Sequence, residues 1–147
     1  MNARAYADTG FLCSVYAPDA NSPRAIARMA GQDLPKPFTW LHQLEFRNAL
    51  RLRVFRNEIT PSQRDASLNA MLSDIATGVL ADIDPPLDSV RTEAERLSAL
   101  HSETLGTRSL DILHVASALV LGIPDFLSFD QRQSSLARAA GLNVPAL

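Results

Sequence analysis

The segment Phe126-Leu127-Ser128-Phe129-Asp130-Gln131-Arg132-Gln133 joins a short apolar run to a carboxylate and then to a polar stretch of helical character. The run Phe126 to Phe129 favours a strand, and the stretch from Gln131 to Ala140, closed by Gly141, favours a helix. In an open α/β sheet, ligands bind beyond the carboxyl ends of the strands. The segment therefore predicts an α/β fold and marks Asp130 as a candidate site residue.

The start of the chain has the same arrangement. Arg4 to Asp8 is a strand candidate, and Asp8 or Thr9 can cap a helix that runs from Gly10 to about Tyr16. Asp8 and Asp130 each follow an apolar run and precede a helix, so both are expected to project into one crevice.

Strand and helix signals alternate in the rest of the chain. Further strands are predicted at residues 35–40 and 79–83, and further helices at 24–30, 41–56, 61–76, 87–102 and 109–121. Thr60-Pro61 is a capped helix start with proline at the first helical position. The alternation predicts an α/β sandwich with a mainly parallel central sheet.

Two more carboxylates, Glu45 and Asp111, occupy predicted helix faces that are largely apolar. By three- and four-residue spacing, their neighbours on these faces are Leu41, Asn48 and Leu52 for Glu45, and His114, Val115 and Ala118 for Asp111. Close carboxylates repel and burial worsens the repulsion, so a fold that gathers them must supply a cation. Oxygen ligands favour Mg²⁺ or Mn²⁺, and the chain has no cysteine or histidine cluster for zinc.

Each of these carboxylates also has a purely structural interpretation. Asp8 and Asp130 could cap the helices that follow them. Glu45 could be a solvated helix residue paired with Arg47 or Asn48, and Asp111 could stabilise the first turn of its helix through the macrodipole. The presence of all of them in one chain favours the functional interpretation.

The composition is that of one domain. The chain has 147 residues, 46% of them apolar, which suffices for a substantial core. The net charge of −2 argues against a purely charge-driven nucleic-acid binder, but not against a nuclease whose metal supplies positive charge locally. Cys13, the single cysteine, cannot form an internal disulfide. With no signal-peptide pattern and no apolar run long enough to span a membrane, cytoplasmic residence is the default expectation.

The segment Gly106-Thr107-Arg108-Ser109-Leu110-Asp111-Ile112-Leu113-His114-Val115-Ala116-Ser117-Ala118-Leu119 and the segment 126–133 together carry a resemblance. With Ala7-Asp8-Thr9 near the start and Glu45 on the second long helix, they closely resemble the PIN-domain family, specifically the VapC-type toxins of type II toxin-antitoxin systems. The resemblance covers essentially the whole chain in order. It implies a PIN-like α/β/α sandwich over a single domain, 1–147, and a metal-dependent endoribonuclease that hydrolyses RNA.

The resemblance also implies a site. Mg²⁺ or Mn²⁺ would be held by Asp8 and Asp111 most directly, with Glu45 and Asp130 completing the acidic pocket, partly through water. The supporting residues that match family positions are Thr9 and Ser128, whose hydroxyls hydrogen-bond within the pocket, and Arg108 and His114, which line or buttress it. His114 is interpreted as a core histidine and left out of the catalytic set.

Two residues depart from the family pattern. Gly10 stands where VapC-type proteins more often have serine, and Ser128 replaces the commoner threonine. Neither change removes a carboxylate, so only details of hydrogen bonding and of the turn between strand and helix are in doubt.

The partners implied are an RNA substrate, a cognate antitoxin and a second copy of the chain in a homodimer. The predicted helix 41–56 is apolar on more than one face. Ordinary core packing together with a neighbouring helix near residues 70–75 is the simplest explanation, and the partner contacts implied by the resemblance are the other. The alternative that stays open is a non-catalytic PIN-like module that binds RNA or protein. Asp8-Thr9-Gly10 also spells the aspartic-protease triplet, but the helix predicted directly after it does not suit the all-β fold of those enzymes.

Overall fold

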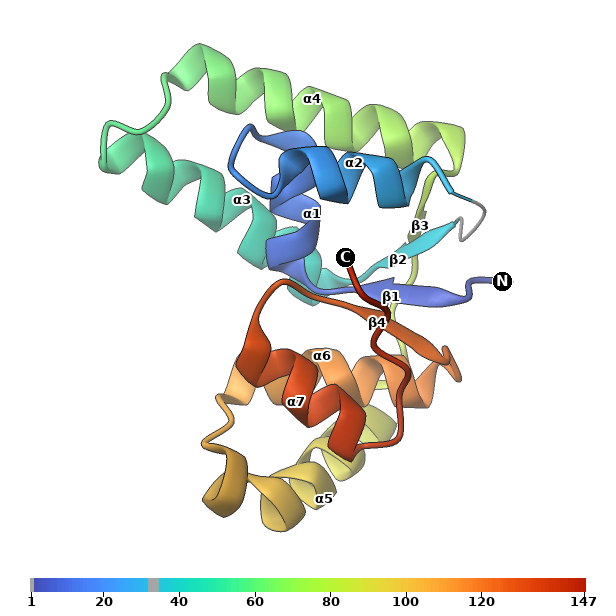
Figure 1. Ribbon diagram of the computed structural model, residues 1–147. Coiled ribbons are helices and arrows are strands. Elements are labelled where there is room, and N and C mark those ends of the chain that lie inside the picture. The colour runs from blue at the N-terminus through green and yellow to red at the C-terminus, as the bar shows by residue number, and fades with distance from the viewer. Residues whose placement is uncertain (1, 32–34) are drawn as a thin grey trace.

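The computed structural model describes residues 2–31 and 35–147. In chain order its elements are β1 (Ala5–Ala7), α1 (Thr9–Tyr16), α2 (Ser22–Met29), β2 (Lys36–Phe38), α3 (Trp40–Phe55), α4 (Pro61–Thr77), β3 (Leu80–Asp82), α5 (Leu87–Leu105), α6 (Ser109–Val120), β4 (Asp125–Leu127) and α7 (Gln131–Ala139). A layer of short strands lies between two groups of helices, α1 to α4 on one side and α5 to α7 on the other (Figure 1). The predicted α/β/α sandwich is confirmed.

The strands pair in parallel, as predicted. β1 pairs with β4, with Tyr6 opposite Phe126, and β2 pairs with β3. β1 also lies against β2, so the two pairs form one layer. Parallel pairing brings the ends of β1 and β4 to the same edge, although these strands come from opposite ends of the chain. The residues that follow them, Asp8 and Ser128, therefore meet.

Alternation along the strands divides the interior into two cores. Ala5 and Ala7 of β1 pack with helices α1 to α4, whereas Tyr6 between them packs with helices α5 to α7. On β4, Leu127 and Phe126 divide in the same way. Successive side chains of a strand point to opposite faces, so one short strand serves both helical layers.

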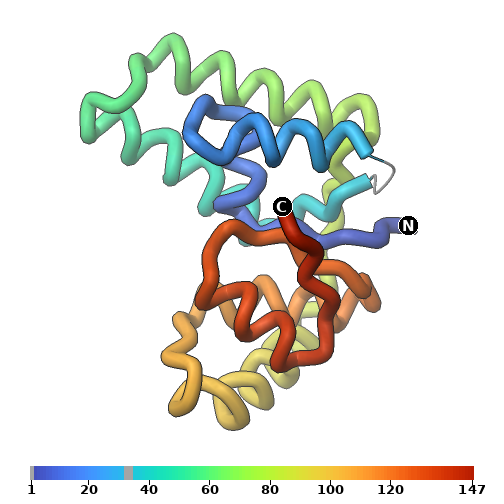
Figure 2. Tube along the Cα trace, in the orientation of Figure 1, coloured from blue at the N-terminus to red at the C-terminus, as the bar shows by residue number. Residues whose placement is uncertain are grey.

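The end of the chain lies beside β4. Asn143 forms an isolated parallel bridge with Asp125 at the start of β4. The Cα trace shows the segment after α7 rising past β4 toward α2 (Figure 2). There the Arg24 guanidinium donates to the Leu147 carbonyl oxygen at 3.4 Å.

Several predicted boundaries shift in the structure. β4 ends at Leu127, so Phe129 lies outside the strand, and α5 continues to Leu105, beyond the predicted end at residue 102. The predicted face of the helix around Glu45 is partly wrong, because Asn48 and Leu52 are exposed. The core-facing residues of α3 are Leu41, His42, Phe46 and Leu50. Because α3 has apolar residues on several faces, its sequence does not decide which face points toward the core. Packing against the sheet decides it.

Within residues 2–31 and 35–147, no helix combines the length and the apolar character that crossing a bilayer requires.

Candidate active site

Asp8 follows β1 directly and is 6% exposed. Its two carboxylate oxygens have different partners. Oδ1 accepts a hydrogen bond from the Phe11 backbone N–H at 2.8 Å and so caps α1, while Oδ2 accepts one from Ser128 Oγ at 2.5 Å. The capping interpretation and the pocket interpretation of Asp8 are therefore compatible, because each uses a different oxygen.

Burial is the main influence on the Asp8 carboxyl. Loss of solvation raises its pKa above the ordinary value, although the hydrogen bonds from Ser128 and from the Phe11 N–H oppose the shift. A positive charge on His114 would lower the pKa further, and the neighbouring Asp130 carboxylate raises it. The net rise means that the surrounding residues do not fully compensate a negative charge on Asp8.

Asp130 divides its oxygens in the same manner. Oδ1 accepts hydrogen bonds from the Arg132 and Gln133 backbone N–H groups, at 2.8 and 3.1 Å, and so caps α7. Oδ2 pairs with Arg108 Nη2 at 3.2 Å. The Asp130 N–H donates to Ser128 Oγ at 3.0 Å, so Ser128 links Asp130 to Asp8.

Glu45 enters the site from α3. Its Oε1 accepts a hydrogen bond from Thr9 Oγ1 at 2.8 Å and lies 2.5 Å from His114 Nε2. The suggested pairing of Glu45 with Arg47 or Asn48 is wrong, because Glu45 turns away from its helix neighbours toward α1 and α6. Burial alone would raise the Glu45 pKa, but the hydrogen bond and charge of His114, and then Thr9 and the charge of Arg108, lower it overall.

Arg108 and Asp111 complete the group at the start of α6. Arg108 Nε lies 2.9 Å from Asp111 Oδ2, and the same guanidinium reaches Asp130. The Arg108 side chain is 60% exposed, whereas that of Asp111 is 14% exposed. Asp111 shares its helix face with buried His114, Val115 and Ala118, as predicted.

The predicted residues thus form one connected group at the carboxyl ends of β1 and β4. The hydrogen-bonded and ionic links run from Asp111 through Arg108, Asp130 and Ser128 to Asp8, and from Thr9, next to Asp8, to Glu45 and His114. No three Asp, Glu, His or Cys side chains within residues 2–31 and 35–147 already surround one point as metal ligands. In this arrangement Arg108 is the cation that faces Asp111 and Asp130.

The donor chemistry of this group fits a hard divalent cation. The charged acceptors are all carboxylate oxygens, which Mg²⁺ and Mn²⁺ prefer. The buried and under-compensated Asp8 is the residue that would gain most from a nearby cation, because an opposite charge lowers a carboxyl pKa that burial has raised. Arg108, the cation now paired with Asp111 and Asp130, has a side chain that is 60% exposed.

Two contributors to the site were not predicted. Tyr6 lies fully buried on β1, and its Oη is 2.7 Å from His114 Nδ1. His42, also fully buried, lies 4.7 Å from His114 between ring centroids and 2.8 Å from the Ala7 carbonyl oxygen through Nε2. The single available signal for Tyr6 was a polar aromatic inside an apolar strand, which alone does not distinguish a core residue from a site residue.

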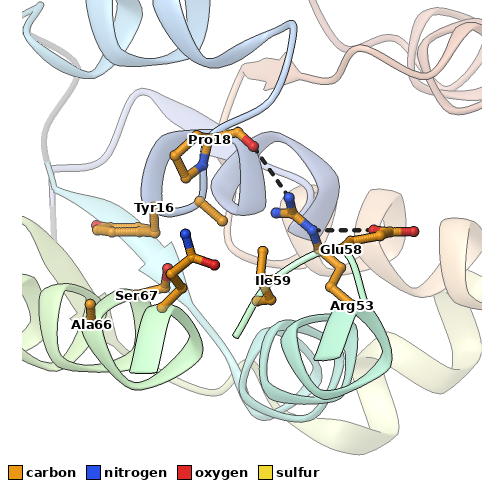
Figure 3. Close-up of a pocket in the computed structure, with 9 residues that line it drawn as sticks. Tyr16, Pro18, Arg53, Glu58, Ile59, Ala66 and Ser67 are labelled. Carbon is orange, nitrogen blue, oxygen red and sulfur yellow. Dashed lines mark hydrogen bonds and ion pairs between the residues drawn. The ribbon is translucent and has the colours of Figure 1, made fainter. Parts of the chain in front are cut away.

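A groove lies apart from the carboxylates, between the end of α1 and the hairpin formed by α3 and α4. Its volume is about 410 Å³, and its lining residues include Tyr16, Ala17, Pro18, Arg53, Glu58, Ile59 and Ser67. The close-up shows Arg53 held between the Pro18 carbonyl and Glu58 at one side of the groove (Figure 3). The groove therefore has apolar walls and one charged edge.

No protein-family model and no curated protein matched the sequence. Twelve chains of solved structures match the fold, and three of them are described here. VapC20 of Mycobacterium tuberculosis, described as a Sarcin-Ricin loop cleaving toxin, is 20% identical over 94% of this chain and 95% of its own, with a TM-score of 0.69. FitAcB from Neisseria gonorrhoeae is 14% identical over 97% and 96%, with a TM-score of 0.64. VapBC2 from Rickettsia felis, bound to a DNA fragment from their promoter, is 13% identical over 96% of both chains, with a TM-score of 0.63. The chain therefore has the same PIN-like α/β/α fold as these structures.

Proposed function

We propose that this chain is a Mg²⁺- or Mn²⁺-dependent endoribonuclease and the toxin of a toxin-antitoxin pair. The observation that carries the proposal is the connected group of Asp8, Glu45, Asp111 and Asp130 at the carboxyl ends of β1 and β4. The likeness to VapC20, described as a toxin that cleaves the Sarcin-Ricin loop, supports RNA as the substrate.

The metal would be held by Asp8, Asp111, Glu45 and Asp130, directly or through water. When bound, a divalent ion supplies the positive charge that activates a water and balances the negative charge developing on the phosphate. Asp8 is the most buried of the four, and the Phe11 N–H and Ser128 Oγ hold both of its oxygens. Thr9 Oγ1 likewise donates a hydrogen bond to one oxygen of Glu45.

In this proposal Arg108 also binds a phosphate of the RNA. Its guanidinium is exposed and forms single hydrogen bonds to Asp111 and Asp130. Arginine recognises phosphate oxygens through a planar fork of donors. On RNA binding, Arg108 would exchange carboxylate partners for the phosphate, which places the backbone of the RNA beside the carboxylates.

The activity is tested with purified protein and a single-stranded RNA labelled at its 3′ end. Cleavage products with a 5′-phosphate should form with Mg²⁺ or Mn²⁺, vanish with EDTA and return when Mn²⁺ is added back. Asp111→Asn should remove the activity, and Glu103→Gln, on the exposed surface of α5, is the control that should retain it. Undiminished cleavage in EDTA or by the Asp111 variant would contradict the mechanism.

The alternative of a non-catalytic PIN-like binding module makes a different prediction. Calorimetry should detect binding of Mn²⁺ to the chain if the carboxylates serve catalysis, since a module that only binds RNA or protein does not need the ion. Titrating the metal-free protein with Mn²⁺, and then with RNA in its absence, separates the two. RNA binding without any ion binding would favour the module.

The proposed antitoxin site is the groove between α1 and the α3–α4 hairpin (Figure 3). Its size and mainly apolar walls suit one face of a short helix or an extended peptide. Expression of this chain alone should stop growth, and co-expression of the protein encoded beside it should restore growth. Ala66→Arg, which fills the groove, should abolish rescue while toxicity persists; indifferent growth without the antitoxin would count against the toxin role.

The exposed apolar residues of α3 support a homodimer. Trp40, Leu44 and Phe55 are 47%, 61% and 82% exposed. A surface of this kind is usually covered by a partner. Sedimentation of the purified chain should give the mass of a dimer, and Leu44→Asp should give a monomer; the wild-type mass of a monomer would contradict the proposal. Sequencing of RNA ends after induced expression would identify the RNA that is cleaved.

A further inference from the structure

A polar cavity adjoins the carboxylates at Ser128. Its volume is about 270 Å³, and its walls are the start of α2, the turn at Ser128 and Phe129, part of α7 and residues 144–147. Ser128 lines this cavity, and its Oγ also donates to Asp8 Oδ2. The cavity therefore lies beside the group that is proposed to hold the ion, although none of its described lining residues is one of the four carboxylates.

The side chains that line this cavity carry positive charge. Among the described residues of its walls, the charged side chains are Arg24 and Arg138, and none is a carboxylate. In the groove beside α1, by contrast, Arg53 pairs with Glu58. A concave surface lined by charges of one sign concentrates ions of the opposite sign. The cavity is thus suited to an anion, in a chain whose net charge is −2.

Neutral groups hold the Arg24 guanidinium in place. Nη2 donates to Asn21 Oδ1 at 2.6 Å, Nη1 reaches the Leu147 carbonyl oxygen at 3.4 Å, and the guanidinium carbon lies 5.0 Å from the centroid of the Phe129 ring. These contacts orient the guanidinium without neutralising its charge, and they use two of its five N–H groups. The other N–H groups remain for the planar contact that arginine makes with a phosphate.

Helix α7 supplies a second arginine and a hydroxyl. Arg138 and Ser134 are four residues apart on α7 and share one of its faces. Within residues 2–31 and 35–147, Arg138 has no carboxylate partner and Ser134 Oγ has no hydrogen bond. Ser134 is only 3% exposed, and a hydroxyl at so buried a position normally has a partner. An anion in the cavity would accept a hydrogen bond from Ser134 and pair with both arginines.

The first residue of α7 connects this cavity to the candidate active site. Gln131 lines the cavity and also a second hollow, whose other lining residues are Arg108, Asp130 and Arg132. In the proposed function, Arg108 binds a phosphate of the RNA in that hollow. A strand that passes from there over Gln131 brings another of its phosphates into the cavity.

We propose that the cavity binds a backbone phosphate that flanks the scissile linkage of the RNA, with Arg24 and Arg138 as the cations and Ser134 as a further donor. The identity of the strand rests on the proposed function, whereas the binding itself requires neither the ion nor cleavage. Contacts to phosphate position a nucleic acid without reading its bases. The cavity therefore holds the strand in register with the carboxylates and does not select its sequence.

The first experiment measures binding of a short fluorescent single-stranded RNA in EDTA, by anisotropy at several salt concentrations. Arg24→Gln and Arg138→Gln, both at exposed positions, should each weaken binding about 10-fold, the usual effect of losing a hydrogen bond to a charged group. The double variant should also make the slope of log K against log salt shallower by about 0.7, the value for one phosphate contact of a single strand. Arg24→Lys retains the charge and should keep the slope.

Arg4→Gln is the matched control, because the exposed Arg4 precedes β1 and so lies at the opposite end of this strand from Asp8. It should bind the RNA as the wild type does. Affinities of Arg24→Gln and Arg138→Gln within about twofold of the control, with an unchanged salt slope, would overturn the inference. A wild type that does not bind the RNA in EDTA would also overturn it.

The second experiment locates the phosphate in the strand. A methylphosphonate linkage lacks the negative charge of a phosphate, and it is placed at each linkage of the same RNA in turn. At one linkage it should weaken binding to the wild type about 10-fold, and at that linkage it should have no further effect on the Arg24→Gln/Arg138→Gln double variant. Losses that add to those of the double variant at every linkage would overturn the inference.

Two further measurements separate this inference from its alternatives. Calorimetry with inorganic phosphate tests whether the cavity serves a free anion, and phosphate binding that needs both arginines while RNA binding does not would overturn the inference. Cleavage of the same RNA with Mn²⁺ tests the proposed function. A wild type that binds RNA through Arg24 and Arg138 but cleaves none would contradict the nuclease and support the cavity as an RNA site.

Discussion

The inner wall of the candidate site, formed by Asp8, Glu45 and His114, contrasts with its rim, formed by Arg108 and Asp130. Asp8 and His114 are 6% and 2% exposed, whereas the side chains of Arg108 and Asp130 are 60% and 43% exposed. The inner residues are held by short hydrogen bonds from three different elements. At the rim, the solvated Arg108 pairs with Asp130 and Asp111, and backbone N–H groups of α7 hold the other oxygen of Asp130.

The buried charges of the inner wall and the solvated charges of the rim interact with their surroundings differently. On the inner wall, burial raises the pKa of both carboxyls. It prevails at Asp8, whereas the hydrogen bond and charge of His114 bring the pKa of Glu45 below its ordinary value. At the rim, water screens the charges, and an exposed pair is worth about 0–1 kcal/mol. The inner wall is thus preorganised, while the rim can rearrange when an ion or a phosphate arrives.

The largest expected effect is on RNA cleavage. Asp8→Asn should reduce kcat by about 10³-fold or more, since the proposed ion would contribute several kcal/mol to the transition state and Asp8 is the most buried of its proposed ligands. Asp130→Asn should lose about 10–100-fold, the usual cost of a contact made through another group. Single-turnover cleavage of one RNA by both variants measures the difference. Equal losses would remove the distinction between inner wall and rim.

The next effect is stabilisation by the ion. Mn²⁺ at about 100 times its Kd should raise the free energy of unfolding of the wild type by about 2.7 kcal/mol. For a chain of this size that corresponds to a rise in Tm of about 5–10 °C. Asp8→Asn should show no rise, and Asp130→Asn a smaller one. Thermal melts at several Mn²⁺ concentrations test this, and an equal rise in Asp8→Asn would place the ion elsewhere.

The pH dependence of the metal-free protein should identify Asp8. Its pKa is raised in the folded state, so the folded protein retains this proton over a pH range in which the unfolded chain has lost it. The stability present below the unfolded pKa is therefore lost as the pH rises through the folded pKa. Asp8→Asn cannot ionise and should be more stable than the wild type at pH 7, with the difference shrinking toward pH 4. Denaturant titrations at both pH values measure it, and a difference of the opposite sign would show that Asp8 is well compensated without metal.

The smallest effect belongs to the rim. Arg108→Gln should change the free energy of unfolding by less than about 0.5 kcal/mol, because water already solvates most of the guanidinium. Ser128→Ala is the comparison variant at a buried position. It should lower the free energy of unfolding by about 1.5–3 kcal/mol, since it removes a hydrogen-bond donor from the buried Asp8 carboxylate. Urea titrations compare the two. A larger loss in Arg108→Gln would mean that the ion pair at the rim is structural.

The elements of the fold were predictable because their signals are local. Thr60 followed by Pro61 begins a helix in the structure, with Gln63 completing a capping box, and Asp8 and Asp130 cap the helices that follow them. Such signals depend on residues three or four positions apart, which lie together in any helix. The boundaries at Phe129 and at the end of α5 moved, because packing rather than propensity decides the last residues of an element.

The four carboxylates of the candidate site were also named in advance, but their pairing with other residues was not. Nothing near Glu45 in the chain pointed to Thr9 or His114, which are 36 and 69 positions away. The resemblance to VapC-type proteins supplied the group as a set, and its metal and catalytic roles stay predictions. Because α3 is apolar on several faces, only its packing on the sheet could turn Glu45 toward the site.

The sequence by itself determined the alternation of strands and helices, the caps at Asp8 and Asp130, and the carboxylates that follow strands. These features arise from short-range sterics and hydrogen bonding. Only the tertiary structure decided that Tyr6 reaches His114 across 108 positions, that Ser128 reaches Asp8 across 120, and that Arg108 stands between two carboxylates. Parallel pairing of β1 with β4 joins the two ends of the chain, and contacts of that kind depend on how layers pack rather than on which residues are neighbours in sequence.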